Sequence, residues 1–180
     1  MKVLKQFWKV FGGNTVAALT EGKTAPGFSL PAMNGSKFSL SEALSRGPVV
    51  AAFFKISCPV CQFALPFVER IYQAHRNQRV TVIGISQNDA KGTAAFIKEY
   101  GLTFPVLLDD TDAYPVSNAY GLTNVPTIFW IAQAGEIEIS SVGWSRNDIE
   151  EINRKAAEVD GSAPMPVFEL EESVPEFRAG

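Results

Sequence analysis

Sulfur and imidazole side chains are scarce in this 180-residue chain, which holds two cysteines, one histidine and three methionines. A structural zinc ion needs four ligands, so the chain offers too few candidates for such a site. A structural disulfide is not expected either, because Cys58 and Cys61 would close only a very short loop and constrain the unfolded chain little. The two cysteines are therefore available for chemistry, and no metal site is expected.

An excess of positive charge is also missing. The chain has 16 Lys and Arg against 19 Asp and Glu, a net charge of -3. Residues 1–23 are basic and residues 158–180 are acidic, which leaves the middle of the chain nearly neutral. Without a basic surface to neutralise phosphates, nucleic-acid binding is not expected.

Long hydrophobic runs are absent too, since no stretch approaches the roughly 20 apolar residues of a membrane span. The basic start resembles the first part of a signal peptide, but the apolar run after it is broken by Gly12 and Gly13. Residues 1–11 instead predict a short amphipathic helix that packs on the domain or on a partner. Membrane contact is not expected. We expect a cytoplasmic location, with a periplasmic or membrane-associated one as the alternative.

What is present suggests one globular domain, because 46% of the residues are hydrophobic. We assign residues 1–23 to an N-terminal extension, 24–157 to the domain, and 158–180 to an acidic, proline-containing tail. The tail lacks a helical period and predicts an extended, partly ordered arm. Val167, Phe168 and Leu170 could dock it on the domain.

Hydrophobic periodicity predicts a mixed sheet covered by helices on both faces. A hairpin is expected around Asn34 and Gly35. Strands are expected at 49–54, 80–85, 105–108, 127–131 and 137–142, and helices at 40–45, 59–77, 90–100, 114–120 and from Ser145 to about 157.

The cysteines lie where the buried strand 49–54 gives way to a helix. Unpaired backbone N–H groups at a helix N-terminus favour thiolate over thiol, and Pro59 suits the first helical turn. We therefore expect Cys58 to be the nucleophile and Cys61, one turn further in, to be the resolving thiol. Lys55 could favour the thiolate of Cys58, unless it is simply a solvated lysine.

Other polar and aromatic residues have simpler interpretations. His75 is expected at the surface, and Asp109 and Asp110 are expected to be loop carboxylates. Trp130 and Trp144 are expected to be aromatics of the core or its rim.

Three features together resemble the thioredoxin fold: the Cys-Pro-Val-Cys sequence after a buried strand, Pro66 inside the next helix, and Asn124-Val125-Pro126-Thr127 before a later strand. The chain is similar to the redoxin branch over about residues 24–157. That branch contains the TlpA-like thiol-disulfide oxidoreductases and the alkyl hydroperoxide reductase/thiol-specific antioxidant family. The resemblance implies an α/β thioredoxin-like fold with a mixed central β-sheet, helices on both faces and an N-terminal β-hairpin.

The same resemblance implies a thiol-disulfide oxidoreductase with no cofactor besides its Cys58–Cys61 pair. Its partners would be a protein disulfide or dithiol substrate and a second redox protein. It also implies a cis peptide bond that faces the cysteines, between Val125 and Pro126. The implied substrate contacts are Pro59, Val60, Val125, Pro126 and Thr127.

The chain departs from the family pattern beside the resolving thiol. Thioredoxins carry a buried Asp six residues before the first cysteine, where this chain has Ala52. TlpA-like proteins often carry a Glu three residues after the second cysteine, where it has Ala64. Both usual candidates for proton handling are missing.

Two alternative functions fit the sequence less well. Peroxiredoxin-like thiol peroxidases carry Thr or Ser three residues before the reactive cysteine and Pro seven before it, where this chain has Lys55 and Ala51. Copper-binding assembly factors of the Sco type separate their cysteines by three residues and add a distal histidine. Here two residues separate them, and His75 belongs to the predicted helix of the cysteines.

Overall fold

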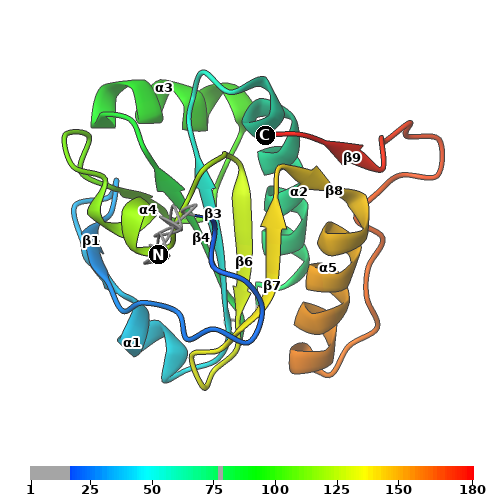
Figure 1. The fold of residues 1–180 in the computed structure, drawn as a ribbon. Helices are drawn as coiled ribbons and strands as arrows, with labels where there is room; N and C mark the ends of the chain where they lie inside the picture. Colours follow the sequence, from blue (N-terminus) through cyan, green and yellow to red (C-terminus); the bar gives the residue numbers. More distant parts are fainter. Residues whose placement is uncertain (1–16, 77–78) are drawn as a thin grey trace, which may run out of the picture.

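The structure is a computed structural model that describes residues 17–76 and 79–180 (Figure 1). The helix predicted over residues 1–11 lies outside the described residues. Within them, no helix is both long enough and apolar enough to cross a membrane.

A five-stranded mixed sheet forms the centre, in the order β5-β4-β3-β6-β7. Its strands are β3 (Val49–Phe54), β4 (Thr81–Ser86), β5 (Val106–Leu108), β6 (Thr127–Ile131) and β7 (Ile137–Val142). Strands β3, β4 and β5 are parallel, whereas β6 and β7 are antiparallel to their neighbours. The predicted hairpin is also present, formed by β1 (Ser29–Pro31) and β2 (Lys37–Ser39). These findings confirm the mixed sheet and the N-terminal hairpin.

Helices cover both faces of the sheet. One core contains side chains of α2 (Pro59–Ala74), α3 (Ala90–Tyr100) and α5 (Arg146–Asp160). The other contains side chains of α1 (Leu40–Leu44), α4 (Pro115–Ala119) and the hairpin. Trp130 and Trp144 are both buried in the first core, as predicted.

Strand β3 supplies both cores because successive side chains of a strand point to opposite faces. Val50, Ala52 and Phe54 belong to the core of α2, and the intervening residues belong to the core of α4. All six residues of β3 are buried. This double burial explains why its sequence is uninterruptedly apolar.

Local capping sets several helix boundaries. Asp89 accepts a hydrogen bond from the Gly92 N–H at the start of α3, and Gly101 ends that helix in the left-handed region. Ser145 caps α5 as predicted, but the helix continues to Asp160 rather than to about Ala157. Helix α2 ends at Ala74, earlier than the predicted end near residue 77.

The C-terminal tail is more ordered than predicted, because it folds back over α2 and α5. Val167 is buried and Phe168 stacks against Phe67, with ring centroids 5.2 Å apart. Leu170, the third predicted docking residue, is instead fully exposed. The tail ends in a short strand, β9 (Phe177–Arg178), paired with β8 (Trp144–Ser145).

Candidate functional site: two thiols beside a cis-proline loop

Strand β3 delivers the cysteines to the N-terminus of α2. Cys58 is the N-cap residue, with an extended backbone, and its sulfur accepts a hydrogen bond from the Cys61 N–H at 3.3 Å. The Cys58 carbonyl accepts from Gln62 N–H at 3.0 Å. The free end of the helix backbone is thus directed at the Cys58 sulfur, as the sequence predicted.

Two amide side chains fix the loop that carries Cys58. Asn88, after β4, accepts a hydrogen bond from the Ile56 N–H at 3.0 Å. Gln62, on α2, donates to the Ile56 carbonyl at 2.9 Å. The loop is therefore bonded both to the sheet and to the helix, which limits the positions that the Cys58 sulfur can take. Neither amide was predicted, since each acts on a backbone group that the sequence does not reveal.

Cys61 lies behind Cys58 in the apolar core and has no exposed surface. Burial raises the pKa of its thiol well above the ordinary value, although a backbone hydrogen bond from Lys55 acts in the opposite direction. Ala52 and Ala64 belong to the same buried cluster. Alanine at both positions therefore adds only apolar surface around this thiol.

The loop before β6 faces the cysteines. The Val125–Pro126 peptide bond is cis, as the resemblance implied. The Cys58 thiol donates a hydrogen bond to the Val125 carbonyl at 3.2 Å. Thr127 begins β6, is buried, and donates its hydroxyl to the Asn124 carbonyl at 2.8 Å. The half-exposed Val125 is thus the residue of this loop that contacts the Cys58 sulfur.

The remaining predicted site residues lie around this contact. Pro59 is exposed and Val60 half-buried, both in the first turn of α2. The Lys55 carbonyl accepts from the Cys58 N–H at 3.2 Å, whereas its exposed ammonium lies 5.6 Å from the ring centroid of Tyr114. Lys55 contacts both cysteines through its backbone, and an effect of its charge on Cys58 stays a prediction.

The prediction that His75 lies at the surface was wrong. His75 is buried, not at the surface: its Nδ1 lies 2.7 Å from an Asp160 oxygen and its Nε2 3.0 Å from the Asn153 oxygen. Asp109 is a loop carboxylate after β5, as predicted, and it is buried, accepting three hydrogen bonds from Val116 and Ser117 at the start of α4. Both are structural groups that hold helix ends.

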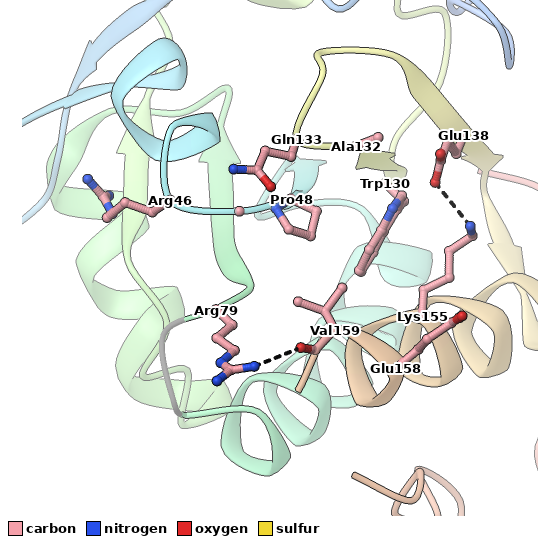
Figure 2. A pocket seen from close by; sticks show the side chains of 11 residues that line it. Arg46, Pro48, Arg79, Trp130, Ala132, Gln133, Glu138, Lys155, Glu158 and Val159 are labelled. Carbon is pink, nitrogen blue, oxygen red and sulfur yellow. Dashed lines mark hydrogen bonds and ion pairs between the residues drawn. The ribbon is translucent and has the colours of Figure 1, made fainter. Parts of the chain in front are cut away.

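A pocket of about 470 Å³ lies at the opposite end of β3 from the cysteines (Figure 2). It lies between the turn at Pro48 and the end of α5, and the Lys155–Glu138 ion pair of 3.0 Å flanks it. Neither Cys58 nor Cys61 lines this pocket. Among the described residues, no cluster of three or more His, Cys, Asp or Glu side chains is placed to hold a metal ion.

Comparison with known proteins agrees with this geometry. A model of the AhpC/TSA family matches residues 22–140. Thiol-disulfide oxidoreductase ResA from Geobacillus kaustophilus is 31% identical over 135 residues, which cover 74% of this chain and 76% of that protein. ResA from Bacillus subtilis is 33% identical over 129 residues, covering 71% and 69%. A thiol:disulfide interchange protein, DsbE, from Chlorobium tepidum superposes with a TM-score of 0.69 at 22% identity, covering 79% of this chain and 99% of that one. This likeness confirms the thioredoxin-like fold.

Proposed function

This chain belongs to the AhpC/TSA family and is a thiol-disulfide oxidoreductase, and we propose that it reacts with protein disulfides through Cys58 as nucleophile and Cys61 as resolving thiol. One observation carries the assignment of roles. Cys58 is partly exposed at the helix N-terminus and its thiol is hydrogen-bonded to the Val125 carbonyl, whereas Cys61 is fully buried behind it.

The reaction proceeds in two exchanges. The Cys58 thiolate attacks one sulfur of the substrate disulfide, which breaks the S–S bond, forms a mixed disulfide and releases one substrate thiolate. Cys61 then loses its proton and attacks the Cys58 sulfur, which forms the Cys58–Cys61 disulfide and releases the second substrate thiolate. Two electrons pass to the substrate, and a dithiol partner returns the pair to its reduced form.

The second exchange requires the buried Cys61 thiol to lose its proton. Burial holds Cys61 in its protonated form, and Ala52 and Ala64 supply no base. The proton must therefore leave with the departing substrate thiolate or through water. We expect the mixed disulfide to resolve faster as the pH rises.

Trapping of the mixed disulfide tests the roles. Cys61→Ser should accumulate a Cys58-linked adduct with a model protein that contains a disulfide, visible on a non-reducing gel and released by dithiothreitol, because no thiol at residue 61 resolves it. The matched variant Cys58→Ser should form none. A Cys61→Ser variant that traps nothing, yet consumes hydrogen peroxide as fast as the wild type, would favour a thiol peroxidase instead.

A further inference from the structure

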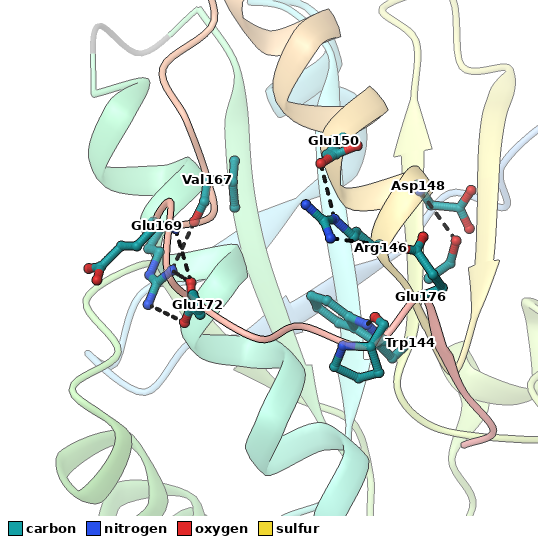
Figure 3. Close-up of polar contacts among 11 residues, drawn as sticks. Trp144, Arg146, Asp148, Glu150, Val167, Glu169, Glu172 and Glu176 are labelled. Atoms are coloured by element: carbon teal, nitrogen blue, oxygen red, sulfur yellow. Dashed lines mark hydrogen bonds and ion pairs between the residues drawn. The ribbon is translucent and has the colours of Figure 1, made fainter.

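The C-terminal tail is fastened at several points before it reaches the site (Figure 3). The Arg70 guanidinium on α2 donates to both Glu172 carboxylate oxygens, at 2.6 and 3.0 Å. The Trp144 indole N–H donates to the Pro175 carbonyl at 2.7 Å. These contacts direct the last residues toward the end of β3 and the start of α2, where the cysteines lie.

The final residues of the tail pack directly on the loop that carries Val125. The Asn124 side chain donates a hydrogen bond to the Gly180 carbonyl at 2.9 Å. The Gly180 backbone lies so close to the loop that a Cβ atom there would be 2.6 Å from the Val125 oxygen. That oxygen is the acceptor of the Cys58 thiol. The tail therefore contacts the residue that the reactive sulfur touches.

The same residues also cover the flank of α2 beside the cysteines. The Arg178 guanidinium lies 4.1 Å from the ring centroid of Phe63, two residues after Cys61. Gly143, at a φ of 79°, gives room for this approach, since a Cβ there would lie 2.5 Å from the Arg178 carbonyl. We call residues 177–180 the closing segment.

We propose that the closing segment occupies the polypeptide-docking edge of the site, so that a protein substrate must displace it to reach Cys58. The proposal rests on the function proposed above. An extended substrate segment cannot lie along Val125 while the Gly180 backbone is in van der Waals contact with it. A small disulfide needs only the half-exposed sulfur.

The closing segment also indicates what kind of polypeptide displaces it. It is extended, its Arg178 cation lies over an aromatic ring, and a residue without a side chain fits beside Val125. A substrate segment with a basic side chain two positions before a small residue can make the same contacts. Competition between the two raises the apparent KM for protein substrates, because only the open fraction of the enzyme binds.

Variants of the 180-residue chain in which the contacts of the closing segment are weakened test the proposal. Gly180→Val introduces the clash with Val125, Arg178→Glu removes the contact with Phe63, and Ala179→Val is the matched control at an exposed position. Reduction of insulin and of 5,5′-dithiobis(2-nitrobenzoate) is followed for each protein. Both loosened variants should lower the KM for insulin about three- to tenfold with kcat unchanged. The control should match the wild type, and all four proteins should reduce the small disulfide at equal rates.

A peptide of residues 174–180, added to Arg178→Glu, should restore the higher KM, and the same peptide with glutamate in place of its arginine should not. An unchanged or higher KM for insulin in variants that reduce the small disulfide normally would overturn the proposal. If Gly180→Val does not fold, Arg178→Glu and the peptide decide alone. A wild-type protein that reduces neither disulfide would instead refute the underlying function, so the two failures can be told apart.

Discussion

Cys61 should set the alkaline stability of the reduced protein. Its side chain is fully buried, and burial raises its pKa well above the ordinary value. In the unfolded chain a cysteine loses its proton near pH 8.5, whereas folded Cys61 keeps its proton at that pH. Above pH 8.5 the folded state therefore binds more protons than the unfolded state, and the free energy of unfolding falls as the pH rises.

The size of this effect follows from the titration of the unfolded thiol. Each pH unit above about 8.5 removes about 1.4 kcal/mol, so about 2 kcal/mol is lost between pH 7 and pH 10. Tyr120 acts in the same direction, since burial raises its pKa as well. An unfolded tyrosine titrates near pH 10, so its contribution at that pH is about 0.4 kcal/mol. Cys61 therefore dominates the window from pH 8 to pH 10.

Urea unfolding at pH 7, 8, 9 and 10 with a non-thiol reductant measures the effect. Cys61→Ala should be less stable than the wild type at pH 7, because a buried sulfur is lost. That difference should shrink by about 2 kcal/mol by pH 10, since the variant has no thiol at residue 61 to titrate. Cys58→Ala, which leaves Cys61 in place, must retain the alkaline loss. Parallel stability curves for wild type and Cys61→Ala would refute the reasoning.

Three further predictions follow from single contacts. At pH 7, iodoacetamide should modify Cys58 well before the buried Cys61, as mass spectrometry would show; equal rates would remove their assigned roles. Gly84→Ala should lower stability to urea by about 1–3 kcal/mol, because its Cβ would lie 2.9 Å from the Phe104 ring; an unchanged midpoint contradicts this. Asp109→Asn should lower the free energy of unfolding by about 1–3 kcal/mol and speed amide exchange at the start of α4, because the carboxylate accepts hydrogen bonds from backbone N–H groups there. Unchanged exchange rates would contradict that role.

Features encoded by neighbouring residues could be predicted from the sequence. Strands β6 and β7 and helix α3 begin and end where the pattern placed them. Their apolar periods and caps, such as Asp89 and Gly101, lie within the elements themselves or next to them. The cysteine pair belongs to this group, because one short stretch carries the strand end, both thiols and the first helical turn.

Features made by partners far apart in the chain could not be predicted. His75 is buried because Asn153 and Asp160, 78 and 85 residues away, supply the oxygen atoms that its ring nitrogens contact. The tail is ordered for the same reason, since Arg70 and Glu172 are 102 residues apart. The charge and proline content of the tail predicted an extended, partly ordered segment. The residues of the domain that bind the tail come together only in the folded structure.

The division of β3 between two cores has a consequence for how this protein can change. Substitutions at alternate positions of β3 change the packing of different cores. One core contains α2 and its thiols, and the other contains α4 and the hairpin. Each core can therefore be repacked while the other is left alone. Val125 is the exception, because it packs against both cores. Because the Val125 carbonyl accepts the hydrogen bond of the Cys58 thiol, repacking of the core that lacks the thiols can still reach the reactive sulfur through this one residue.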